Sequence, residues 1–175
     1  MNSKRKGFSL IELLIVIAII LIIAAIAIPN LLKAKGAANA ASAVGSLRAV
    51  TTANQIYQNT NGGFALSLGL MGPGTGGANL LDAVLSGCAT GVTCTSSQTT
   101  TSKSGYNFLY TPGTSAVSTN QSYTITATPG TGLPSGLSAY CTDGSGAILQ
   151  DTSGTFTPTT ATVGCTTTSA TSSPI

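Results

Sequence analysis

The most constraining feature of this sequence is a long apolar segment close to its N-terminus. Between Phe8 and Ile28 the only charged residue is Glu12, and a helix over these residues would be roughly 31 Å long. This length matches the hydrocarbon thickness of a bilayer, about 30 Å. The segment is therefore predicted to cross a membrane, and a carboxylate inside such a helix is costly enough to indicate a function.

A basic leader with the sequence MNSKRKG precedes the apolar segment. Its three cations, Lys4, Arg5 and Lys6, lie directly before the predicted span. By the positive-inside rule they keep the N-terminus in the cytoplasm and send the rest of the chain outward.

The junction between leader and span resembles the N-terminus of type IV prepilins and of the pseudopilins of type II secretion. The resemblance is carried by the run KGFSLIE, from Lys6 to Glu12, and by the apolar stretch that follows it. It implies that a prepilin peptidase cleaves between Gly7 and Phe8 and that the new amine of Phe8 is methylated. It also implies that Glu12 acts in filament assembly and that Pro29 bends a long helix.

The same resemblance divides the chain into three parts. Residues 1–7 are the leader peptide, residues 8–29 the membrane-spanning and later filament-core half of the helix, and residues 30–175 the globular domain outside the membrane. The Glu12 carboxylate would accept the charged amine of Phe8, in its own chain or in the next subunit. A charge in apolar surroundings is tolerated when it is paired in this way.

Two alternatives stay open for the N-terminal segment. An ordinary signal peptide also has a basic start and an apolar core, and residues 25–27 (Ala-Ile-Ala) would serve as its cleavage site. The apolar stretch is, however, longer than the usual core of about 7 to 15 residues, and it contains Glu12. The second alternative is that Glu12 simply lies near a helix end and reaches the lipid headgroups.

Charged residues make up only 6% of the chain, and three of the cations lie in the leader. Without the leader the positive and negative side chains balance, so no basic surface for nucleic acid is indicated. A near-neutral surface is compatible with a protein that packs against copies of itself. The balancing charges are Lys33, Lys35, Arg48 and Lys103 against Glu12, Asp82, Asp143 and Asp151.

All four cysteines follow the predicted span, which fits an oxidising compartment. Four cysteines allow three connectivities; we favour the neighbouring pairs Cys88 with Cys94 and Cys141 with Cys165. The second pair would resemble the C-terminal disulfide loop of many type IV pilins. A zinc site is disfavoured because the chain has no His and no CxxC pair.

The helical period continues beyond Pro29. Apolar and aromatic residues recur at three- and four-residue steps as far as Tyr57, and residues 59–63 (Asn-Thr-Asn-Gly-Gly) predict the end of the helix. We favour one continuous helix through Pro29 that packs on a sheet. The alternative is a second helix that begins at Pro29, where proline is common in a first turn.

Beyond residue 63 the chain is rich in Gly, Ser and Thr. We expect a loop at 69–77, a short helix at 79–85 capped by Asn79, and a polar loop at 94–104. Residues from 152 on are expected to form a loosely ordered tail that Cys165 partly holds. Strands are expected at 106–110, 122–127 and 137–142, with a possible fourth at 147–149.

Catalytic chemistry is not visible in the sequence. The chain lacks His, the commonest general base. Asp82, Asp143 and Asp151 have no sequence reason to pair, and the glycines at 72–77 lack the Lys-Ser/Thr ending of a phosphate-binding loop. We therefore expect no enzyme activity, no cofactor and no metal site.

The sequence predicts an α+β pilin-type fold, with one long bent helix packed on a small antiparallel sheet of three or four strands. The resemblance implies a structural subunit of a type IV pilus, with a prepilin peptidase, an inner-membrane assembly platform and copies of itself as partners. The subunit would wait in the inner membrane and end in a surface pilus. A periplasmic pseudopilus is the main alternative, although Asp143 and Asp151 are too sparse for an obvious calcium cluster. A signal-anchored periplasmic binding module is the other.

Overall fold

A computed structural model describes residues 7–113, 122–133, 136–153, 165 and 172–175. It contains one long helix, α1 (Leu10–Asn61), and a six-stranded antiparallel sheet, together with two short helical turns. The α+β fold class predicted from the sequence is confirmed. The chain divides into two compact units, one up to Lys35 and one from Gly36 on.

Helix α1 is continuous and includes Pro29 within its length. The prediction of one helix rather than two is thus confirmed, while the bend at Pro29 remains a prediction. The helix ends where its stop signal stands: Gly62 has a φ of +78°, and its N–H donates to the Gln58 carbonyl at 2.8 Å. A left-handed residue closes helices in this way, and glycine adopts that conformation without strain.

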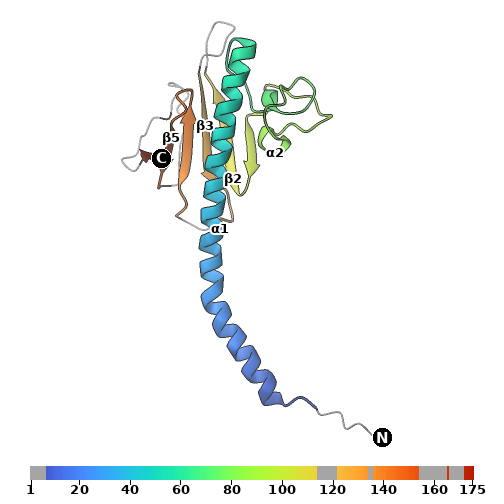
Figure 1. Ribbon diagram of the computed structural model, residues 1–175, viewed down its shortest axis with the longest axis vertical. Helices are drawn as coiled ribbons and strands as arrows, with labels where there is room; N and C mark the ends of the chain where they lie inside the picture. Colours follow the sequence, from blue (N-terminus) through green and yellow to red (C-terminus); the bar gives the residue numbers. More distant parts are fainter. Residues whose placement is uncertain (1–6, 114–121, 134–135, 154–164, 166–171) are drawn as a thin grey trace. The chain divides into compact units, whose positions relative to one another are not determined.

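The sheet is a simple meander in which each strand pairs with the next one along the chain. Figure 1 shows the second half of α1 running along one face of it. The strands are β1 (Thr100–Lys103), β2 (Tyr106–Pro112), β3 (Tyr123–Pro129), β4 (Ala139–Asp143), β5 (Ile148–Asp151) and β6 (Ser172–Pro174).

The two outer strands were not expected from the sequence. β1 lies in the segment predicted as a polar loop, and β6 lies near the end of the predicted tail, most of which is outside the described residues. Both are short edge strands without buried apolar residues, so they lack the alternation that marks a half-buried strand. Ser104 and Gly105 form the two-residue hairpin turn between β1 and β2, and both have the positive φ that such a turn requires. The Ser-Gly pair is the sequence feature that indicates this turn.

The core lies between the second half of α1 and the sheet face that it covers. Leu47 and Val50 of the helix are fully buried, as are Tyr110 and Ile125, which are opposite one another on β2 and β3. Asn54 is also fully buried. Its Oδ1 accepts a hydrogen bond from the Ala65 N–H at 3.2 Å, so this polar residue fixes the chain where it leaves the helix.

The connection from α1 to β1 differs from its prediction. Helix α2 spans only Ala83–Ser86, and its cap is Asp82, whose Oδ1 accepts from the N–H groups of Val84 and Leu85. A short helix is present within the region expected at 79–85, but it begins at Ala83, and the prediction of Asn79 as its cap is wrong. The N–H of Asn79 donates to the Gly72 carbonyl at 2.9 Å, so tertiary hydrogen bonds to the glycine-rich segment replace the first helical turn.

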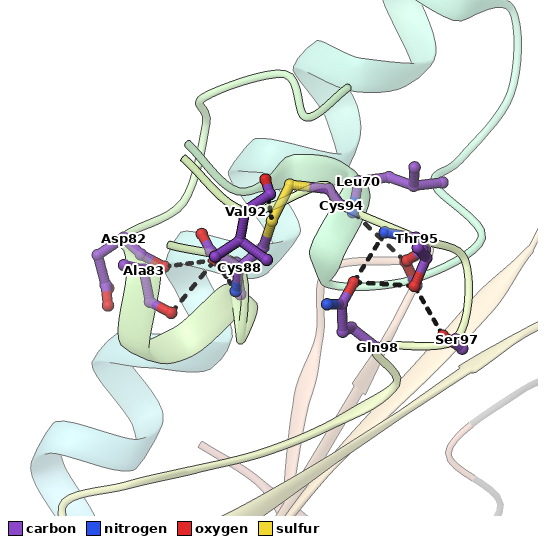
Figure 2. Close-up of a disulfide and its surroundings, with 11 residues drawn as sticks. Leu70, Asp82, Ala83, Cys88, Val92, Cys94, Thr95, Ser97 and Gln98 are labelled. Carbon is purple, nitrogen blue, oxygen red and sulfur yellow. Dashed lines mark hydrogen bonds between the residues drawn. A yellow bond between two sulfur atoms is a disulfide. The ribbon is translucent and has the colours of Figure 1, made fainter. Parts of the chain in front are cut away.

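This connection is closed by the disulfide between Cys88 and Cys94, drawn in Figure 2. The Cα atoms of the two cysteines are 5.6 Å apart, and Cys88 is fully buried. A side chain at Gly74 or Gly77 would overlap the sulfur of Cys88 or Cys94. The glycine-rich segment thus serves to pack against a disulfide.

The second disulfide joins Cys141 on β4 to Cys165, with a Cα–Cα distance of 5.8 Å. The Cys165 N–H also donates to Asp143 Oδ2 at 3.2 Å. Burial would raise the pKa of Asp143, but hydrogen bonds from Ser145 and Cys165 outweigh it and leave this pKa lowered. Both disulfides are the pairs that the sequence analysis favoured.

Candidate processing and assembly site

The expected cleavage site lies in a non-helical segment just before α1. Gly7, Phe8 and Ser9 have no helical structure, and the Phe8 side chain is 83% exposed. A Cβ built on Gly7 would meet no atom within 4 Å. Packing within the chain therefore does not require glycine at this position.

Ser9 and Glu12 together form the start of α1. The Ser9 carbonyl accepts hydrogen bonds from the N–H groups of Glu12 at 3.1 Å and Leu13 at 3.3 Å. In return, the Ser9 N–H donates to Glu12 Oε2 at 2.9 Å. This is the carboxylate half of a capping box, in which an acid at the third helical position reaches back to the residue before the helix.

Ser9 was not among the residues predicted to matter. The signal that would have found it is the spacing Ser-x-x-Glu before an apolar run, which Ser9 and Glu12 satisfy. From the sequence, Glu12 was expected to pair with an amine or, alternatively, to reach the lipid headgroups from a helix end. The structure gives the same carboxylate a local role in setting where the helix begins.

The apolar half of α1 is uncovered on all sides. Large side chains from Leu10 to Leu32 are about half exposed or more, for example Ile11 at 63% and Leu21 at 67%. The helix is long and apolar enough to cross a membrane by length and composition. A helix that is apolar all round requires lipid or other helices as its surroundings.

The remaining carboxylates do not form a shared site. Asp82 caps α2 and pairs with Lys103, whose Nζ is 2.8 Å from Asp82 Oδ2. Asp151 accepts from the N–H and the hydroxyl of Ser153 at 2.8 and 2.7 Å. Among the described residues no three His, Cys, Asp or Glu side chains gather as metal ligands would.

Two open cavities occur in the described part of the globular unit. One, of about 340 Å³, lies between the end of α1 and residues 76–80, and the other, of about 510 Å³, lies over β1 and β2. Neither is lined by Asp, Glu, Lys or Arg. Neither of these two cavities therefore contains an acid–base pair of charged side chains.

The N-terminal region of the chain is similar to that of known proteins. Residues 2–28 match the family described as the prokaryotic N-terminal methylation motif. The chain is 46% identical over 56 residues to the type IV major pilin protein PilA of Myxococcus xanthus, covering 32% of this chain and 26% of that protein. It is 45% identical over 73 residues to the type IV wide pilus major component PilA4 of Thermus thermophilus, covering 38% of this chain and 56% of that protein.

The chain thus matches about a quarter of one relative and just over half of the other. No solved structure matches it. One relative is named as a major pilin and the other as a major component of a wide pilus. The resemblance drawn from the residues between Lys6 and Glu12 is therefore confirmed.

Proposed function

We propose, from the premise that its N-terminal region is that of the type IV pilin family, that this chain is a structural subunit of a type IV pilus. The observation that carries the proposal is the placement of the methylation motif. The match covers residues 2–28; within it the exposed, non-helical residues 7–9 lead directly into the uncovered apolar half of α1. A protease needs an exposed, non-helical segment to cleave, and a filament core needs an apolar helix whose surface is free to pack against other helices.

Processing would begin at the bond between Gly7 and Phe8, within the matched motif. Gly7 has open space around it, so the need for glycine would come from the cleft of the prepilin peptidase. The bond lies before the first turn of α1, where the backbone is free to adopt an extended conformation. The same enzyme would methylate the Phe8 amine, which leaves its positive charge in place.

Assembly would transfer the apolar half of α1 from lipid into a bundle of identical helices. The inner-membrane platform would be the partner at this step, and the contacts between copies would be heterologous and non-closing. Such contacts generate helical filaments rather than closed rings. Glu12 would help to set the axial register, because it is the only carboxylate in the apolar half and must remain paired.

The pseudopilus stays as the second candidate, and two observations favour the pilus over it. The relatives are named as type IV pilus components. In addition, Asp143 and Asp151 are each engaged by neighbouring hydrogen bonds and do not form an acidic cluster for calcium. The chain would accordingly wait in the inner membrane and end at the cell surface.

Mass spectrometry of the native protein tests this proposal. Intact mass and N-terminal peptides are measured for the protein from membranes and from the sheared surface fraction. A chain that starts at methylated Phe8 and is abundant in the sheared fraction is expected. A chain that starts at Ile28, or one that keeps Met1, would leave a secreted or simply anchored domain. Mature protein confined to the periplasmic side would favour the pseudopilus.

A further inference from the structure

Two lysines lie directly after the uncovered apolar half of α1. Lys33 and Lys35 are both exposed, and they are the first charged residues after Glu12. From Leu10, where the helix begins, Lys33 is 23 residues away, or about 35 Å at the usual rise of a helix. The hydrocarbon layer of a bilayer is about 30 Å thick. A helix that begins at its inner edge would therefore place both lysines among the headgroups of the outer leaflet.

The chain itself offers these two cations no counter-charge. In the described part of the chain neither lysine has an ion-pair partner. The sequence contains four acidic side chains, and Glu12 lies at the other end of the span, about 31 Å from Lys33. The remaining three are engaged by a cation or by N–H and hydroxyl donors: Asp82, Asp143 and Asp151. The anion that faces the two lysines must therefore come from outside the chain.

We propose that Lys33 and Lys35 bind the phosphate groups of anionic phospholipids in the outer leaflet, and so fix the depth of the unassembled subunit in the membrane. This inference rests on the membrane-inserted stage of the proposed function and adds a lipid partner to it. Lysine suits this contact because its ammonium binds phosphate as a compact charge with three N–H donors. Its flexible stem also lets the charged end reach the headgroups while the methylenes lie along apolar surface.

The two lysines project from different sides of α1. Side chains two residues apart in a helix are separated by about 200° around its axis and do not face each other. Each lysine would consequently bind a headgroup of its own. Contacts on nearly opposite sides of the helix would oppose its tilting toward either side as well as its movement along the membrane normal.

These contacts also bear on assembly. Once the leader has been removed, Lys33 and Lys35 are the cationic side chains nearest to the span, since Arg48 follows only 13 residues after Lys35. The contacts must break when the apolar half of α1 leaves the lipid for the filament. A higher fraction of anionic lipid should therefore hold the waiting subunit in the membrane more tightly.

A single tryptophan can report which lipids surround the two lysines. The chain has no Trp, so Leu31→Trp introduces the only one. Leu31 is 68% exposed, and tryptophan is well tolerated at the membrane interface. Phospholipids with brominated acyl chains quench tryptophan over a short range. Quenching by brominated phosphatidylglycerol, compared with brominated phosphatidylcholine, therefore measures the lipid preference at this end of the span.

The test uses the full-length mature protein with Leu31→Trp in mixed vesicles of the two lipids. We expect a preference of about fivefold for phosphatidylglycerol, which should fall to about one when Lys33→Gln and Lys35→Gln are combined. Arg48→Gln is the matched control and should keep the preference. It removes the same charge from an exposed position of α1, but about 20 Å further along the helix, or two Debye lengths. Lys33→Arg combined with Lys35→Arg retains both charges and should also keep the preference.

Three results would overturn the inference. They are a lack of preference in the parent protein, an equal preference in the double Gln variant, and a loss of preference in Arg48→Gln that matches the loss in the double variant. Replacing chloride by inorganic phosphate at equal ionic strength should leave the preference unchanged. If phosphate abolishes it, the lysines bind the free ion rather than the lipid, and the inference also fails.

The N-terminal mass spectrometry described above separates this inference from the proposed function. Methylated Phe8 in sheared filaments, without a preference for phosphatidylglycerol, would overturn the lipid contact alone. A chain that keeps Met1 in the membrane and prefers phosphatidylglycerol would overturn the pilus and leave the lipid contact standing. A chain that starts at Ile28 would lack the span, and both would fail.

Discussion

The two halves of α1 belong to the same helix and have opposite surroundings. From Leu10 to Lys35 no residue is buried, whereas from Gly36 on a stripe that includes Leu47, Val50 and Asn54 is buried against the sheet. The first half is apolar on every side, and the second is apolar on only one. The difference shows that the second half has its partner within the chain, while the first half must find its partner outside it.

The largest effect is expected at Glu12, the one carboxylate in the uncovered half of α1. Glu12→Gln keeps the size of the side chain and removes the charge that would pair with the Phe8 amine. We expect assembly to be lost or strongly reduced and membrane insertion to be unchanged. The protein in sheared and membrane fractions is measured by immunoblotting, and unchanged amounts in the sheared fraction would contradict the assembly role.

The same substitution placed in both halves separates packing within the chain from packing between chains. Leu47→Ala, at a fully buried position, should lower the free energy of unfolding of the globular unit by about 2 to 5 kcal/mol. Leu21→Ala, at a position that is 67% exposed, should change it by less than about 0.5 kcal/mol. Urea denaturation in detergent micelles, followed by the near-UV circular dichroism of the tyrosines, measures both.

In the same pair of variants, the stability of isolated filaments should respond in the opposite order. Leu21→Ala should make sheared filaments easier to dissociate by detergent, because its side chain is predicted to contact neighbouring helices. Equal losses of globular stability in the two variants would show that the uncovered half also packs within the chain.

The sequence was sufficient where a periodic pattern reports burial. It indicated the continuous helix, its end near Gly62, and the central strands with Tyr123 and Ile125. It failed where tertiary contacts decide. Asn79 looks like a helix cap in the sequence, but its N–H bonds to Gly72, and β1 carries no apolar alternation because it lies at an edge.

At the candidate site the acid was identified and its local partner was not. The functional argument for Glu12 came from the cost of a charge in an apolar segment. The cost of such a charge is the same whichever backbone N–H lies nearby, so it gives no indication of Ser9. The capping spacing was visible in the sequence and, combined with the charge argument, would have identified both residues.

Within the globular unit, the two disulfides close loops of different length and should therefore differ in how much they stabilise the fold. Removing Cys88–Cys94 with a double Ala substitution frees a loop of seven residues, and the chain-entropy model gives about 2 kcal/mol for it. Removing Cys141–Cys165 frees a longer loop and should cost about 3.5 kcal/mol. Urea denaturation of the two double variants measures these losses.

Hydrogen exchange should locate each loss. The first double variant should lose protection mainly in residues 69–98, where glycines pack on the sulfurs, and the second along β4 and β5. Loss of protection over the whole sheet in the first variant would show that this connection is not a local unit.

The smallest effect concerns Asp82, which like Glu12 caps a helix but already has its cation within the chain. Asp82→Ala removes both the cap of α2 and the pair with Lys103, and should cost about 1 kcal/mol. Asp82→Asn keeps a capping oxygen and should cost less than about 0.5 kcal/mol, because the ion pair is solvent-exposed.

Burial alone would raise the pKa of Asp82, but Lys103 and the backbone N–H groups leave it lowered from 3.8. The carboxylate therefore stabilises the folded chain above pH 3.8, and this contribution disappears as the pH falls through the lowered value. Denaturation of wild type and Asp82→Asn should accordingly differ at neutral pH and converge in acid, and a difference that persists in acid would show that the carboxylate acts by packing rather than by charge.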